Sequence, residues 1–89
     1  MATSEKIQQF KQDLELAEKR IAEIDNVILK LFEQNALGKI SDERFEKMSN
    51  VYENEQRELT NRRDGLKAKI QAEEDKTKNT NQFLETIRK

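Results

Sequence analysis

The sequence predicts an all-α protein: an antiparallel two-helix coiled-coil hairpin with a C-terminal helical extension. Three observations predict it. Apolar residues recur at alternating spacings of three and four over the first third of the chain, and one interruption carries a helix stop signal followed at once by a start signal. The 89 residues also include no proline and only two glycines, with 39% charged side chains, so the turns that a sheet needs are nearly absent.

A first helix is expected over residues 4–37. Thr3 or Ser4 can cap it, and Glu5 suits the positive end of the helix dipole. Its apolar stripe consists of Ile7, Phe10, Leu14, Ala17, Ile21, Ile24, Ile28 and Leu31. A stripe of this period requires a partner helix, because a lone helix would leave all eight side chains in water.

A tight turn is expected over residues 38–41. Gly38 can adopt the left-handed conformation that ends a helix. Ser41 can cap the next helix, whose first two residues are acidic. Ile40 and Phe45 stand where a hydrophobic staple forms. The chain should therefore reverse here into an antiparallel helix.

The second helix is expected over residues 42–74 or beyond, so that the hairpin spans residues 4–73. Its stripe runs through Phe45, Met48, Tyr52, Glu55, Leu59 and Arg62. Folding the chain about Gly38 pairs residues whose numbers sum to about 76, from Leu31 with Phe45 to Phe10 with Leu66. Each pair joins one heptad column to the opposite column, as antiparallel packing requires.

The second stripe changes phase after Leu59. Beyond Leu66 it continues through Ile70 in a register shifted by one residue, and a step from Leu59 to Arg63 would absorb the shift as a stutter. Gly65 lies in the same stretch, at a cost of about 1 kcal/mol relative to alanine in a helix interior. We expect a bend or a loosened segment over residues 59–66.

Residues 74–89 have no partner on the first helix in this register. Phe83, Leu84 and Ile87 give them a short apolar face. We expect this extension to be frayed or docked on another copy, which would make a homo-oligomer, and to begin the following segment of a larger parent protein.

Composition excludes several kinds of chemistry. Without cysteine or histidine the chain has no disulfide, no zinc site of the usual kind and no Ser-His or Cys-His nucleophile pair. The acidic clusters at Glu53 and Glu55 and over residues 73–75 fit a solvated helix face better than a metal site. We expect no catalytic residue, no cofactor and no metal.

Charge and hydropathy bear on partners and location. The net charge is −1, without a basic stripe, so we expect no direct contact with DNA by this chain. No apolar run approaches the roughly 18–20 residues that span a bilayer, and the start lacks a signal-peptide core. These features predict a cytoplasmic protein without membrane contact.

Four apolar residues near the turn lie outside the stripe: Leu29, Phe32, Leu37 and Ile40. One interpretation is that Phe32 and Ile40 close the end of the hairpin over Phe45. The other is a small exposed apolar patch of the kind that marks a protein contact. The sequence supports both, and we select these four residues as the candidate partner-binding site.

Several segments resemble the coiled-coil insertion of the large serine recombinases, which are site-specific DNA integrases and transposases of phages and integrative elements. The resemblance covers about residues 15–88 and is carried by residues 20–25, 31–35, 38–45, 52–56 and 81–88. The most specific stretch is Gly38-Lys-Ile-Ser-Asp-Glu-Arg-Phe45.

This resemblance implies a function. In that family a catalytic domain with a serine nucleophile cleaves and rejoins DNA, a recombinase domain and a zinc ribbon read the attachment site, and the hairpin projects from the ribbon. The resemblance implies that this chain is the non-catalytic arm. Such an arm contacts other recombinase subunits during synapsis and helps to control integration versus excision. DNA would be bound by other domains of the parent.

The heptad stripe also fits an alternative function. A free-standing coiled-coil adaptor or scaffold, unrelated to DNA, could homo-oligomerise through the same stripe. The two hypotheses differ in the gene, because only the first requires a serine-recombinase catalytic domain and zinc-ribbon cysteines in the same reading frame.

Overall fold

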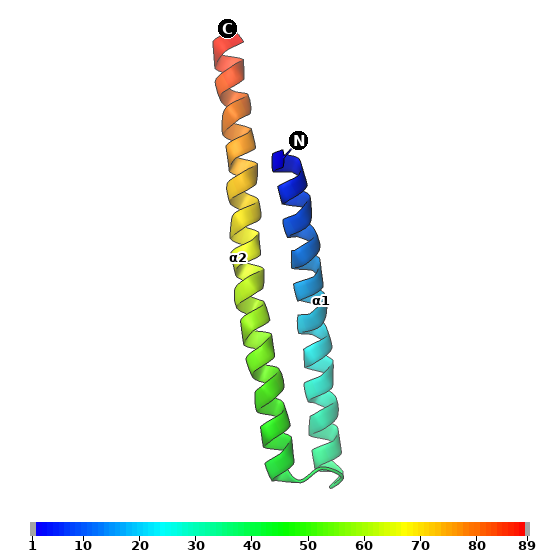
Figure 1. Cartoon of the computed structure of the whole chain (residues 1–89). Coiled ribbons are helices and arrows are strands. Elements are labelled where there is room, and N and C mark those ends of the chain that lie inside the picture. The colour runs from blue at the N-terminus through cyan, green and yellow to red at the C-terminus, as the bar shows by residue number, and fades with distance from the viewer. Residues whose placement is uncertain (1, 89) are drawn as a thin grey trace.

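The computed structural model describes the backbone of residues 2–88 and the side chains of residues 5–76. It contains two helices, α1 (Ala2–Ala36) and α2 (Asp42–Arg88), which pack against each other along an antiparallel hairpin (Figure 1). The molecule is a rod with extents of 73 × 17 × 15 Å. The predicted all-α hairpin is therefore confirmed.

Helix α1 ends at the predicted glycine. Gly38 has a φ of 78°, in the left-handed region, and its N–H donates to the carbonyl of Asn35 at 3.0 Å. The N–H of Lys39 donates to the carbonyl of Gln34 at 2.9 Å. These two bonds are the Schellman pattern, which satisfies carbonyls that the end of a helix would otherwise leave unpaired.

Helix α2 begins with the predicted cap. The Ser41 hydroxyl oxygen accepts a hydrogen bond from the N–H of Arg44 at 3.2 Å. An additional contact closes the turn from the other side: the Asn35 side-chain amide donates to the Ile40 carbonyl (3.1 Å) and to the Asp42 carboxylate (2.7 Å). The turn is thus fixed by hydrogen bonds from both helices.

The core is a single seam between the helices. All eight residues of the predicted α1 stripe are buried or half-buried, and Ile24 is completely buried. Among the described residues, the buried apolar side chains are Ala17, Ile24 and Leu31 on α1 and Leu66 and Ile70 on α2. Two helices cover each other on one side only, so a seam this narrow leaves most of the rod's surface in water.

The phase change in α2 occurs as a stutter. Arg62, predicted to lie in the seam, is exposed, and the neighbouring Arg63 is half-buried in its place. Helix α2 nevertheless continues without interruption through residues 59–66, so the expected loosening is not found. A four-residue insertion rotates the stripe around the helix while leaving the backbone hydrogen bonds intact.

Two contacts are described at the open end of the hairpin. The ammonium of Lys69 lies 5.6 Å from the centroid of the Phe10 ring. The ammonium of Lys11 lies 3.5 Å from the Glu74 carboxylate. Leu66, which was expected opposite Phe10, is buried, and its pairing with Phe10 stays a prediction.

Helix α2 extends past the N-terminal end of α1 (Figure 1). Residues 74–88 prolong the same helix, and their backbone shows no break at the predicted boundary after residue 73. The side chains of Phe83, Leu84 and Ile87 lie outside the described ones, so the expectation about their apolar face stays a prediction. Over the part of the chain that the structure covers, neither helix contains a segment apolar enough to cross a membrane.

Candidate protein-interaction surfaces

Three of the four candidate residues at the turn end are strongly exposed. Leu29 is 56% exposed, Phe32 58% and Leu37 68%, whereas Ile40 is half-buried. The Phe32 ring makes an edge contact with Phe45, with centroids 6.3 Å apart and planes inclined by 64°. Closing the hairpin therefore uses Ile40 and one edge of Phe32, and leaves the rest of the apolar surface in water.

Phe32 stands on one edge of the hairpin. Side chains at every seventh position of α1 reach across this edge to α2. We call this edge the ladder edge. Its polar contacts are Lys11 with Glu74 (3.5 Å), Glu18 with Lys67 (3.9 Å) and Asp25 with Gln56 (2.6 Å). Their partners on α2 are seven residues apart from Glu74 to Lys67 and eleven residues apart from Lys67 to Gln56. The four residues beyond a heptad in the second interval are the stutter.

Phe32 is the next α1 position of the ladder edge, seven residues after Asp25. Seven residues before Gln56 on α2 stands Ser49, which is 8% exposed and whose buried hydroxyl has no hydrogen-bond partner. The described contact of Phe32 on α2 is the edge contact with Phe45. The ladder edge thus changes at the turn end from polar cross-helix contacts to an aromatic side chain that is mostly in water.

Arg20 and Glu55 form the strongest polar contact across the seam. Arg20 donates to both carboxylate oxygens of Glu55, from Nε at 2.7 Å and from Nη2 at 3.2 Å, and also contacts Glu23 at 3.3 Å. These hydrogen bonds lower the pKa of Glu55 below its ordinary value and raise that of Arg20. The predicted seam carboxylate is therefore paired and has a structural role.

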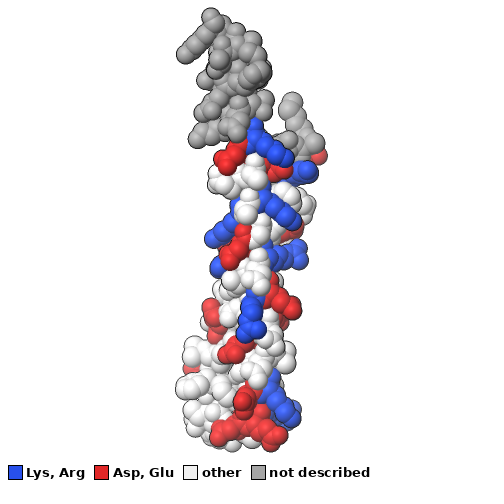
Figure 2. All heavy atoms as spheres, turned by 90° about the vertical axis from the view of Figure 1, so that its left-hand side faces the viewer, with Lys and Arg blue, Asp and Glu red and all other residues white. Residues whose placement is uncertain are grey.

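Charge is distributed unevenly along the rod. Residues 25–56, which form the turn end, carry seven acidic and four basic side chains, a net charge of −3. Residues 57–69 of α2 carry five basic and two acidic ones, a net charge of +3. Figure 2 shows acidic side chains gathered at the turn end and more Lys and Arg further along the rod. The two halves of the sequence, residues 1–40 and 41–89, are each nearly neutral, so this polarity appears only when shorter segments are compared.

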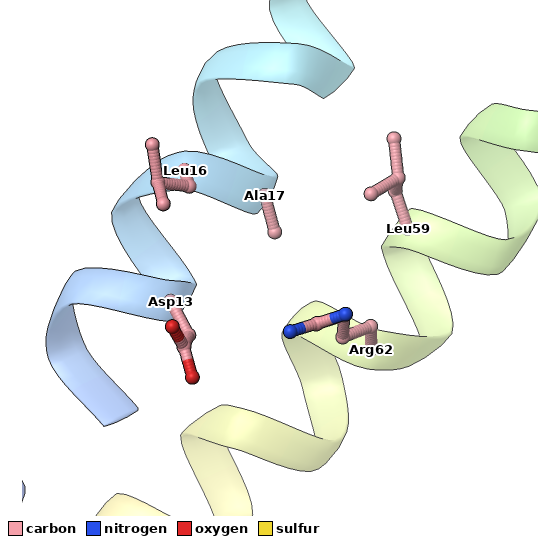
Figure 3. A pocket seen from close by; sticks show the side chains of 5 residues that line it. All are labelled: Asp13, Leu16, Ala17, Leu59 and Arg62. Atoms are coloured by element: carbon pink, nitrogen blue, oxygen red, sulfur yellow. The ribbon is translucent and has the colours of Figure 1, made fainter. Parts of the chain in front are cut away.

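A groove lies beside the seam at the stutter (Figure 3). It has a volume of about 200 Å³ and is lined by Asp13, Leu16, Ala17, Leu59 and Arg62. Leu16, at 65% exposure, stands at its rim. No hydrogen bond or ion pair of Arg62 occurs among the described contacts, whereas Asp13 accepts a hydrogen bond from Gln9 at 3.1 Å.

Two exposed apolar residues were not selected from the sequence. Leu16 and Val51 are each 65% exposed. The signal that could have found Leu16 is the one that selected Leu29, namely a large apolar residue outside the heptad stripe. Val51 stands between the stripe residues Met48 and Tyr52, where its exposure depends on which face α2 turns to α1.

The acidic clusters form no metal site in the described residues. No group of three or more Asp, Glu, His or Cys side chains converges there in a way that could hold an ion. Glu55 pairs with Arg20, Glu73 with Lys76 at 3.7 Å and Glu74 with Lys11. These carboxylates serve contacts within and between the helices.

Comparison with known proteins identifies no relative: no protein-family model, curated protein or solved structure matches the chain.

Proposed function

We propose that this chain is the interaction arm of a serine-type site-specific DNA recombinase. In this role the arm is non-catalytic: it contacts other recombinase subunits during synapsis and helps to control integration versus excision. The observation that carries the interaction role is the exposure of Leu29, Phe32 and Leu37 together at one end of a rod. The recombinase assignment rests on the resemblance of residues 38–45 and their flanks to that family.

The shape of the molecule supports contact through the turn end. A rod that is anchored at its open end reaches a neighbour with the opposite end, and the 73 Å length sets that reach. Each exposed apolar side chain contributes about 25 cal/mol per Å² removed from water. Three such side chains support weak, reversible association after the entropic cost of binding. Subunits held together on DNA need no more, because a high effective concentration compensates for low affinity.

The interaction role is tested by placing charge at the turn end. In a serine recombinase that carries this segment, the double substitution Phe32→Asp and Leu37→Asp should impair synapsis and leave binding to a single attachment site unchanged. Val51→Asp is the control, because it places one negative charge on a similarly exposed apolar residue of α2 that is not among the four candidate residues. Normal synapsis by the double variant, with a hairpin that is folded by circular dichroism, would contradict the proposal.

The assignment to a recombinase is tested separately. It requires that the reading frame encoding this segment also encode a serine-recombinase catalytic domain and zinc-ribbon cysteines. A reading frame without them would favour a coiled-coil adaptor that is unrelated to DNA, and the turn-end contact would then serve that adaptor.

A further inference from the structure

The groove at the stutter has the dimensions of a site for individual side chains. Its 200 Å³ lies below the roughly 300–1,000 Å³ of pockets that take small-molecule ligands. Its floor is apolar, since Ala17 is almost fully buried and Leu59 half-buried. Leu16 and Arg62 stand on opposite sides of the opening (Figure 3). One apolar side chain that enters between them would contact Leu16, Ala17 and Leu59.

The surroundings of the groove favour an acidic partner. Residues 57–69 of α2 have a net charge of +3 and residues 7–19 of α1 one of −1, so this part of the rod carries two excess positive charges. Arg62 and Asp13 both line the groove and face each other across it (Figure 3). Lys67 already pairs with Glu18, and Arg63 with Asp64, so Arg62 is the basic side chain at the opening with no described hydrogen bond or ion pair.

The turn end of the hairpin has the complementary properties. It presents Leu29, Phe32 and Leu37 in water and carries a net charge of −3. Two turn ends facing each other would bring like charges together, which opposes association. A turn end facing the groove would instead bring an acidic apolar surface to a basic apolar one.

We propose that the turn end of one copy docks on the stutter groove of a second copy, with an apolar side chain of the turn end between Leu16 and Leu59 and its carboxylates beside Arg62. This inference rests on the proposed function and specifies the partner of the turn end. The contact is heterologous, because the two copies contribute different surfaces. Each copy keeps one free turn end and one free groove, so repetition adds further copies.

Mixing two variants of the 89-residue chain tests this arrangement by sedimentation equilibrium. The groove variant carries Leu16→Glu and Arg62→Glu, and the turn-end variant carries Phe32→Asp and Leu37→Asp. We expect each variant alone to self-associate at least about tenfold more weakly than the wild type, a difference of 1.4 kcal/mol. An equimolar mixture should form 1:1 heterodimers and no larger species, because each variant retains the surface that the other lacks.

Two controls accompany the mixture. Arg57→Glu reverses a charge in the same basic stretch outside the groove lining and should weaken association less than the groove variant does. Added salt should weaken wild-type association, because opposite charges meet at the contact. Circular dichroism should show unchanged helicity for every variant, since all the substituted side chains are exposed.

The outcomes separate this inference from the proposed function. If the groove variant associates like the wild type and the turn-end variant does not, the contact joins two turn ends. That result would overturn the groove as the partner of the turn end. A turn-end variant that associates like the wild type, or a wild-type chain that is monomeric at about 1 mM, would overturn both.

Discussion

The turn end and the middle of the rod use equivalent positions of the same helix in opposite ways. At Lys11, Glu18 and Asp25 the ladder edge of α1 reaches across to α2 and is satisfied within the hairpin. At Phe32 the same heptad position carries an aromatic ring that α2 contacts at one edge and leaves mostly in water. The comparison shows that a repeat which holds the hairpin together can, by changing one residue type, leave apolar surface exposed.

The largest expected difference is between the effects that substituting a buried and an exposed apolar residue have on the free energy of unfolding. Ile24→Ala should lower the free energy of unfolding by about 2–5 kcal/mol, because Ile24 is completely buried in a narrow seam. Leu29→Ala should change it by less than about 0.5 kcal/mol, since that side chain is mostly in water. Thermal unfolding monitored by circular dichroism measures both. A large loss from Leu29→Ala would mean that the turn end is part of the core.

The two glycines should respond in opposite directions to the same substitution. Gly38→Ala should destabilise the hairpin by about 1–2 kcal/mol, because an L-residue is strained at a φ of 78°. Gly65→Ala should stabilise it by about 0.5–1 kcal/mol, because alanine favours the helix and nothing lies within 4 Å of the added Cβ. Urea titrations provide the measurement. Stabilisation by Gly38→Ala would contradict the Schellman turn.

The smallest expected effect is the change in stability with pH that the Arg20–Glu55 pair causes. The pKa of Glu55 is lower in the folded chain than its ordinary value of 4.5, chiefly because Arg20 donates hydrogen bonds to it. Its contribution to stability is thus fully present above pH 4.5 and is lost as the pH falls through the lowered folded value. Glu55→Gln removes this titration. Between pH 6 and pH 2, the melting temperature should fall further for the wild type than for the Glu55→Gln variant. Parallel curves of melting temperature against pH would exclude the Arg20–Glu55 pair as a pH-dependent contact.

Local signals in the sequence determined most of the architecture. Heptad spacing identified the eight α1 residues that form the seam, and Gly38 and Ser41 identified the turn, because helical period and capping depend on residues close together in the chain. The exposure of Leu29, Phe32 and Leu37 at the turn end also followed one of the two interpretations that the sequence allowed. Ile40 followed the other, since the turn draws it partly inward.

The packing of the two helices decided which side chains lie in the seam and which stay in water. The sequence left the seam open to Arg62 or Arg63, and packing against α1 selected Arg63 and placed Arg62 beside the groove. The net charges of residues 25–56 and 57–69 are set by the sequence, and folding back places the acidic stretch at one end of the rod. Whether an apolar residue outside the stripe is covered depends on what the facing helix places beside it, and Phe45 meets only one edge of the Phe32 ring, which stays 58% exposed. A helical repeat specifies which face is apolar, but only the paired helix determines how much of that face it buries.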